Sequence, residues 1–193
     1  MSVRTVGLVG GGTMGQGIAI TSAAAGLDVL LLEKTPELAR QSLEEIGHTL
    51  ERDIAKWRRT ESEKKAILVR IRAVDAIEAL EASEIVIECV VEDLELKASI
   101  FQRLDQVCPP SDILATNSSS LSVTEIAART HRSDRVIGLH FLQPVPKVPL
   151  VEVVRGLRTS DETFRQAMAF VRLLGKTGIE VFEYPGYVTT RVI

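Results

Sequence analysis

Two titratable side chains interrupt apolar runs in the stretch GLHFLQPVPKVPLVEV, residues 138–153. His140 ends one apolar run, Glu152 lies inside the next, and three prolines separate them. If the two runs are antiparallel neighbours and the loop is centred on Pro146, the histidine and the acid form a directly opposed cross-strand pair. A carboxylate in that place holds the imidazole in one tautomer and stabilises its protonated form, which leaves the other nitrogen free as a general base. The alternative is a core histidine whose polar atoms are merely satisfied.

A second stretch of chemical interest, GLVGGGTMGQG, carries glycines at the spacing G-x-G-x-x-G. It follows an apolar strand pattern and opens a helical pattern, which is the context of a dinucleotide-binding loop. Gly10 allows the tight turn, Gly12 lets the backbone approach a pyrophosphate, and Gly15 lets the helix pack closely on the strand. Thr13 and Met14 lie in the same loop and are expected at the cofactor.

An acid in the expected place supports the same interpretation. Glu33 ends the second apolar run, 18 positions after Gly15. Its carboxylate would accept hydrogen bonds from a ribose 2′-hydroxyl and repel a 2′-phosphate, which favours NAD over NADP. Lys34 weakens that preference slightly. Glu33 is also open to a plainer reading, as a surface acid without a ligand.

The elements that must position these residues follow from hydrophobic periodicity. Apolar runs predict strands over residues 4–10, 28–33, 84–91, 112–117, 135–141, 149–154 and 178–183. Helical spacing or capping signals predict helices over residues 13–26, from Pro36, from Thr60 to about Arg72, over 94–107, after Ser122, and over 161–175. Strands that are apolar throughout and alternate with helices predict an α/β fold, Rossmann-like and doubly wound, with a mostly parallel sheet and a helical hairpin inserted after the second strand.

Composition narrows the class of protein. The 193 residues are 45% hydrophobic and 25% charged, as in ordinary globular proteins, with a net charge of −3 that gives no reason to expect nucleic acid. No apolar run is long enough to span a bilayer, and a strand pattern from Val3 leaves no room for a targeting peptide. Cys89 and Cys108 lack metal-ligand spacing, so we expect no metal site and a reduced, cytoplasmic setting. We expect Cys89 to be a small core residue, and His48 and His131 to be solvated.

Four motifs together carry a family resemblance: GGGTMGQGIA, ECVVEDLELKASIF, TNSSSLSVTEIA and GLHFLQPVP followed by LVEV. Through them the chain resembles the NAD-binding domain of the L-3-hydroxyacyl-CoA dehydrogenase family over essentially its whole length. The resemblance implies reversible, NAD-dependent oxidation of a 3-hydroxyacyl-CoA, as in fatty acid β-oxidation. It also implies that residues 1–184 form the NAD-binding domain, and that residues 185–193 begin a second, all-helical domain that this chain lacks. In the family that second domain carries the dimer contact, so we expect a homodimer when it is present.

The resemblance assigns roles by position. It implies that His140 is the catalytic base with Glu152 as its partner, and that Ser119 touches the substrate hydroxyl and the nicotinamide region. The remaining residues that it places at the cofactor are Glu92, Lys97, Asn117 and Gln143. At the coenzyme A tail it places Lys56 and Thr49, the latter where the family has a serine. Without the family, the serines of 118–120 are equally well explained as loop residues, and the cations around Lys56 as a solvated face.

Three departures from the family pattern leave the substrate open. Gln143 stands where the family has an asparagine, Val148-Pro149 replaces its usual Met-Lys, and Thr190 replaces an asparagine near the nicotinamide and substrate. The form VPLVEV is similar to relatives that oxidise free 3-hydroxy acids, such as gulonate dehydrogenases. The same chemistry on a free 3-hydroxy acid is therefore one alternative. A domain that binds NAD but is inactive without the helical domain is another.

Overall fold

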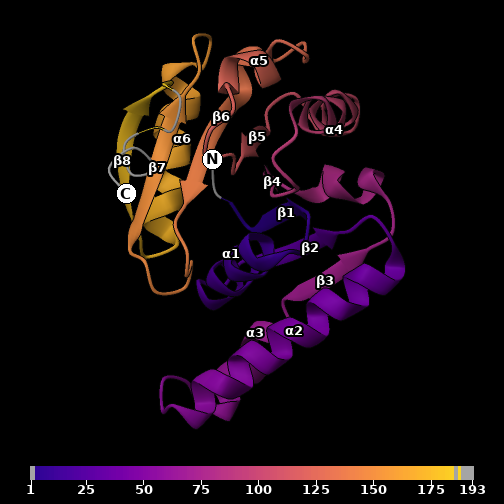
Figure 1. Ribbon diagram of the computed structural model, residues 1–193, viewed down its shortest axis with the longest axis vertical. Helices are drawn as coiled ribbons and strands as arrows, with labels where there is room; N and C mark the ends of the chain where they lie inside the picture. Colours follow the sequence, from indigo (N-terminus) through magenta and orange to yellow (C-terminus); the bar gives the residue numbers. More distant parts are fainter. Residues whose placement is uncertain (1–2, 185–186, 188–193) are drawn as a thin grey trace.

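A single eight-stranded sheet forms the centre of the computed structural model, which describes residues 3–184 and 187 (Figure 1). The strand order is β3-β2-β1-β4-β5-β6-β7-β8. The strands are β1 (Thr5–Val9), β2 (Asp28–Leu32), β3 (Ile71–Val74), β4 (Ile85–Glu88), β5 (Ile113–Thr116), β6 (Val136–Phe141), β7 (Leu150–Arg155) and β8 (Thr177–Phe182). Neighbouring strands are parallel except β6 and β7, which are antiparallel. The predicted doubly wound, mostly parallel fold is confirmed.

Helices cover both faces of the sheet. They are α1 (Thr13–Ala24), α2 (Pro36–Ala55), α3 (Glu61–Leu68), α4 (Leu94–Val107), α5 (Val123–Ala127) and α6 (Asp161–Leu173), with short 3₁₀ turns η1 (Ile77–Ala82) and η2 (Ser133–Arg135). One core cluster unites apolar side chains of α1, α2, α3 and α6 with alternate strand residues, and a second unites η1, α4 and α5 with the intervening ones. Because both faces are covered, the central strands are largely apolar, as the sequence predicts, whereas the edge strands β3 and β8 are partly exposed and carry Arg72 and Glu180.

The predicted helical hairpin is formed by α2 and α3, which lie side by side at one end of the molecule (Figure 1). Thr35 caps α2 and Pro36 occupies its first turn, while Thr60 and Glu63 form the predicted capping box of α3. The prediction that this second helix runs to about Arg72 is wrong. It ends at Leu68, and residues 71–74 instead pair with β2 as the edge strand β3.

Glycines end two of the helices as predicted. Gly26, with φ of 89°, follows α1, and Gly175, with φ of 71°, follows α6. A left-handed residue after the last helical turn satisfies its open carbonyls, and glycine adopts that conformation without steric cost. Ser122 caps α5, since its hydroxyl accepts from the Glu125 amide and donates to Glu183, but among the described residues the Glu125 carboxylate does not return a bond to the Ser122 amide, so the capping box is incomplete.

In the described part of the chain, none of the helices combines the length and the apolar character that crossing a bilayer requires. Of the predicted beginning of a second domain, residues 185–193, only Tyr187 is described, and it lies in a turn.

Candidate active site and cofactor site

The histidine and the glutamate form the predicted pair. In the antiparallel register of β6 and β7, His140 lies directly opposite Glu152. The imidazole Nδ1 is 2.6 Å from Glu152 Oε2, and the two side chains are 9% and 0% exposed. A buried carboxylate this close favours a proton on Nδ1 and orients the ring. Nε2 has no hydrogen-bond partner among the described residues, and His140 lines a cavity.

Strand alternation explains why the pair avoids the main core. In β6 and β7, Leu139 and Val153 belong to the cluster under α1 and α6, so His140 and Glu152 face the side of α4 and α5. Tyr187 covers the imidazole on that side, with ring centroids 5.6 Å apart.

The proline loop between β6 and β7 is held at several points. The amides of Lys147 and Val148 donate to the carbonyl of Pro144, which follows a cis peptide bond. The ammonium of Lys176 donates to the carbonyls of Val145 and Val148, at 2.6 Å each. Burial lowers the pKa of Lys176. The loop is thus anchored to the end of α6 rather than stiffened by its prolines alone.

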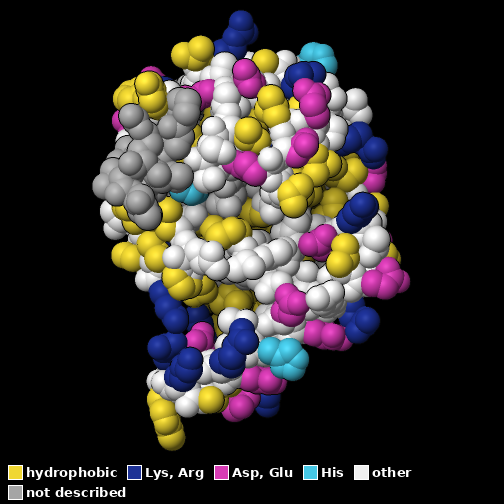
Figure 2. Space-filling model, in the orientation of Figure 1, with side chains coloured by type: hydrophobic (Ala, Val, Ile, Leu, Met, Phe, Trp, Pro, Cys, Tyr) yellow, Lys and Arg dark blue, Asp and Glu magenta, His cyan; other side chains and the backbone are white. Residues whose placement is uncertain are grey.

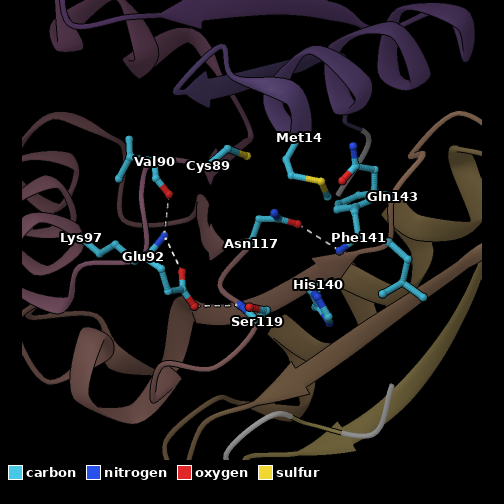
Figure 3. A pocket seen from close by; sticks show the side chains of 11 residues that line it. Met14, Cys89, Val90, Glu92, Lys97, Asn117, Ser119, His140, Phe141 and Gln143 are labelled. Atoms are coloured by element: carbon cyan, nitrogen blue, oxygen red, sulfur yellow. Dashed lines mark hydrogen bonds and ion pairs between the residues drawn. The ribbon is translucent and has the colours of Figure 1, made fainter. Parts of the chain in front are cut away.

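A cavity of about 350 Å³ lies in front of the imidazole (Figure 3). Of the residues predicted from the sequence, it brings together Met14, Glu92, Lys97, Asn117, Ser119, His140 and Gln143. They come from the start of α1, from the segments that follow β4 and β5, from the first turn of α4, and from the end of β6 and the loop after it, so the cavity lies at the carboxyl ends of the parallel strands. That edge is where open α/β sheets bind ligands.

Two of these side chains keep a polar group without a partner among the described residues, the Nδ2 amide of Asn117 and the hydroxyl of Ser119. Asn117 Oδ1 accepts a hydrogen bond from the Phe141 amide at 3.0 Å, which fixes the orientation of its side chain. The backbone amide of Ser119 donates to Glu92 at 3.1 Å, while its hydroxyl has no partner among the described residues. The Ser119 hydroxyl is therefore available to a ligand.

Glu92 and Lys97 were predicted to line the cofactor, and both line the cavity, but they are also engaged with the protein. Lys97 is 1% exposed, and its ammonium lies 2.7 Å from Glu88 and 3.4 Å from Glu92. Burial alone would raise the pKa of Glu92, but the Ser118 hydroxyl and the Lys97 charge outweigh burial and hold the pKa below its usual value.

The glycine loop has the geometry that a dinucleotide needs. Gly10 has φ of +100°, and a side chain on Gly15 would place its Cβ 1.9 Å from the Gly10 carbonyl oxygen. A Cβ on Gly12, by contrast, would have no atom within 4 Å, so the backbone there is open to a ligand. No side chain caps the start of α1 and no acid lies in its first turn. A phosphate can therefore meet free N–H groups and the positive end of the helix.

The acid after β2 stands beside the same loop. Glu33 is half-buried and accepts hydrogen bonds from the amides of Gly11 and Lys34. These contacts hold its carboxylate at the carboxyl end of β2, the position of the ribose-binding acid in dinucleotide folds.

A second cavity, of about 520 Å³, runs between α2 and the proline loop. Thr13, Thr49 and Gln143 line it, and Gln143 also lines the first cavity. Lys56 lines neither cavity and is exposed at the end of α2, so the structure does not bring it to the other predicted substrate residues. Thr190 lies outside the described residues.

Sequence reasoning missed several neighbours of the site. Glu88 carried a usable signal, because it is a lone acid in the apolar run EIVIECVV. Tyr187 carried no such signal in the sequence.

Cys89 is not wholly a core residue, since it is half-buried and lines the first cavity. His48 and His131 are exposed as predicted, although His48 borders the second cavity and His131 pairs with Asp105.

A family model described as "3-hydroxyacyl-CoA dehydrogenase, NAD binding domain" matches residues 5–184. The chain belongs to this family. NAD is accordingly its cofactor, in agreement with the open glycine loop and Glu33.

Similar proteins support the same family assignment. A probable 3-hydroxybutyryl-CoA dehydrogenase of Bacillus subtilis is 46% identical over the whole chain, which covers 67% of that protein. A mouse mitochondrial hydroxyacyl-coenzyme A dehydrogenase is 37% identical, with 99% of the chain and 63% of that protein covered. The crystal structure of (S)-3-hydroxybutyryl-CoA dehydrogenase from Ralstonia eutropha has a TM-score of 0.96 and 41% identity, with 99% of the chain and 68% of that structure covered. The 3-hydroxyacyl-CoA dehydrogenase domain described here thus spans about two thirds of the length of these relatives.

Proposed function

We propose that the protein carrying this chain catalyses the reversible oxidation of the 3-hydroxyl of an L-3-hydroxyacyl-CoA to a 3-ketoacyl-CoA, with NAD as cofactor. The observation that carries the proposal is the buried His140–Glu152 pair, with Nδ1 and Oε2 2.6 Å apart, in which the imidazole lies on the wall of a cavity that Met14 of the dinucleotide loop also lines. A base oriented beside a dinucleotide site is what dehydrogenation of an alcohol requires.

His140 acts as the general base. Its Nε2, which has no partner among the described residues, takes the proton of the substrate hydroxyl, while Nδ1 stays bonded to Glu152. NAD, when bound, supplies the acceptor for the hydride that leaves C3. The Glu152 carboxylate stabilises the imidazolium that forms, and in the reverse direction this imidazolium protonates the developing alkoxide. A positioned base of this kind raises the rate of the chemical step by about 10²- to 10⁴-fold.

The other predicted residues divide between substrate and cofactor. The free hydroxyl of Ser119 donates to the substrate oxygen as charge develops on it. We propose that the nicotinamide end of the cofactor lies against four residues of the cavity wall, Asn117, Gln143, Glu92 and Lys97. The pyrophosphate and ribose sites are formed by Gly10, Gly12, Thr13, Met14, Gly15 and Glu33.

We assign the second cavity to the coenzyme A part of the substrate. Gln143 lies on the walls of both cavities, so the two cavities adjoin at this residue. Thr49 and Arg52 of α2 line the second cavity, and Lys56 continues the same helix face one turn further on. Lys and Arg side chains lie on this hairpin together with Asp and Glu side chains (Figure 2). Thr190 stays a predicted contact, and homodimer formation through a helical domain stays a prediction.

The test is a comparison of substrates with the full-length protein. With NADH, acetoacetyl-CoA should be reduced at least tenfold more efficiently, in kcat/KM, than free acetoacetate, since each tenfold corresponds to about 1.4 kcal/mol of binding to the tail. Equal or better turnover of free 3-keto acids would replace the thioester by a free acid as substrate.

A second experiment tests cofactor binding independently of catalysis. Titration of NADH into residues 1–193 alone should give saturable binding even if this part of the protein turns over slowly. Binding of NADPH as tight as that of NADH would contradict the role of Glu33.

A further inference from the structure

A buried carboxylate outside the proposed catalytic pair lies behind the cavity. Glu88 ends β4 and is 0% exposed. It accepts hydrogen bonds from Lys97 Nζ at 2.7 Å, the Val90 amide at 2.6 Å and the Thr116 hydroxyl at 2.8 Å. Because an ionised carboxylate is costly to bury, this arrangement needs the cation beside it.

Lys97 passes the connection on toward the cavity. Its ammonium has three donors, and three oxygens surround it: Glu88, the Val90 carbonyl at 3.1 Å and Glu92 at 3.4 Å. In Figure 3 Glu92 lies between Lys97 and Ser119. Lys97 is thus shared by a buried carboxylate, Glu88, and one at the cavity, Glu92, whose side chain is 35% exposed.

Glu92 in turn holds the serine loop. A single oxygen, Oε1, accepts from the amides of Ser119 and Ser120 at 3.1 Å each, and from the hydroxyls of Ser118 and Ser120. This is the loop that follows β5 and carries the free hydroxyl of Ser119. The contacts fix its backbone but leave that hydroxyl facing the cavity.

We propose that Glu88 is a positioning residue for Ser119, acting through Lys97 and Glu92. Glu88 holds the Lys97 ammonium at the end of β4, so that Lys97 neutralises Glu92 without drawing it away from the serine amides. Without the charge of Glu88, Lys97 has one neighbouring carboxylate left, Glu92, and pulls it out of the serine loop. The proposal rests on the proposed function only in assigning Ser119 to the substrate oxygen.

If Glu88 served only the stability of the fold, its substitution would have a different measurable effect. Buried ion pairs contribute little net stability, and loss of one partner destabilises a protein wherever the pair lies. A positioning role predicts instead an effect confined to the serine loop and coupled to Ser119. The matched control is Asp112→Asn, because Asp112 is also a buried carboxylate but stands before the start of β5, at the amino ends of the parallel strands and away from the cavity.

The first measurement needs no catalysis. Amide hydrogen exchange, followed residue by residue by NMR without ligands, should be about tenfold faster at Ser119 and Ser120 in Glu88→Gln than in the wild type, because local opening governs exchange. Asp112→Asn should leave both rates unchanged. Unchanged exchange at these amides in Glu88→Gln would overturn the proposal. If Glu88→Gln does not fold, Glu88→Asp, which keeps the charge but withdraws it from Lys97, should show the same change to a smaller degree.

The second measurement is a double-mutant cycle in the full-length protein with acetoacetyl-CoA and NADH. Glu88→Gln and Ser119→Ala should each lower kcat about tenfold with the KM for NADH changed less than about twofold, and the double variant should be no worse than Ser119→Ala alone. If the losses in kcat caused by the two single substitutions multiply in the double variant, the proposal is overturned. A wild-type protein inactive on acetoacetyl-CoA would instead refute the proposed function, and the exchange rates would still decide the role of Glu88.

Discussion

Two glutamates, Glu88 and Glu152, lie at 0% exposure in apolar strands, and each faces a basic side chain. The sequence revealed only one of them, although both are lone acids in apolar runs. Glu152 was predicted because its partner follows from simple antiparallel register. The partner of Glu88, Lys97, lies in a helix that returns to the end of the strand, and the charge pattern of that helix alone is typical of a solvated first turn. Only the folded arrangement distinguishes the two cases.

The pH dependence of stability provides a test at Glu92. Its pKa is lower in the folded protein than usual, so the ionised form is favoured by folding. This contribution is complete above the unfolded value of about 4.3 and is lost as pH falls through the lower folded value. We therefore expect the Tm of the wild type to fall more steeply than that of Glu92→Gln as pH is lowered from about 5 to 3. Parallel Tm curves from calorimetry would contradict the assigned contacts.

At the scale of elements, the signals that predicted correctly were local. Thr35 with Pro36, the Thr60–Glu63 box and Gly26 set helix ends through contacts within a few residues. The strand β3 was missed for the opposite reason. Its four residues begin soon after α3 ends at Leu68, and they become a strand only because β2 offers an unpaired edge. The long-range pairing overrides a local pattern that favours helix.

A residue with a strained backbone conformation follows the end of α2, and we expect its substitution to increase the stability of the fold. Trp57 has φ of 56° and is 96% exposed, and its amide donates to the Ile54 carbonyl. This is the position after a helix where glycine is preferred, and a left-handed L-residue costs about 1–2 kcal/mol. We predict that Trp57→Gly raises the free energy of unfolding by about 1 kcal/mol, measured by urea denaturation.

Trp57→Ala is the control, because alanine removes the indole but keeps the unfavourable backbone conformation. It should stabilise the protein less than Trp57→Gly does. Equal stabilities of the two variants would show that the backbone at this position is not strained.

At the scale of the whole molecule, the site is assembled where the segments after β1, β4, β5 and β6 meet at one edge of the sheet. The sequence predicted this assembly because each segment carries its own signal and parallel strands bring their carboxyl ends together. It could not predict that Gln143 lines two cavities, that Tyr187 covers the imidazole, or that Lys56 lies beyond the second cavity. These depend on how the proline loop and the helical hairpin pack, which no local pattern encodes.

The most direct test of the account is His140→Gln in the full-length protein, with His131→Gln as control because His131 is fully exposed. NADH binding and turnover of acetoacetyl-CoA are measured for both variants. We predict an unchanged Kd for NADH and a loss of about 10²- to 10⁴-fold in kcat for His140→Gln, with the control equal to the wild type. Turnover by His140→Gln within a few-fold of the wild type would contradict the assignment of the general base.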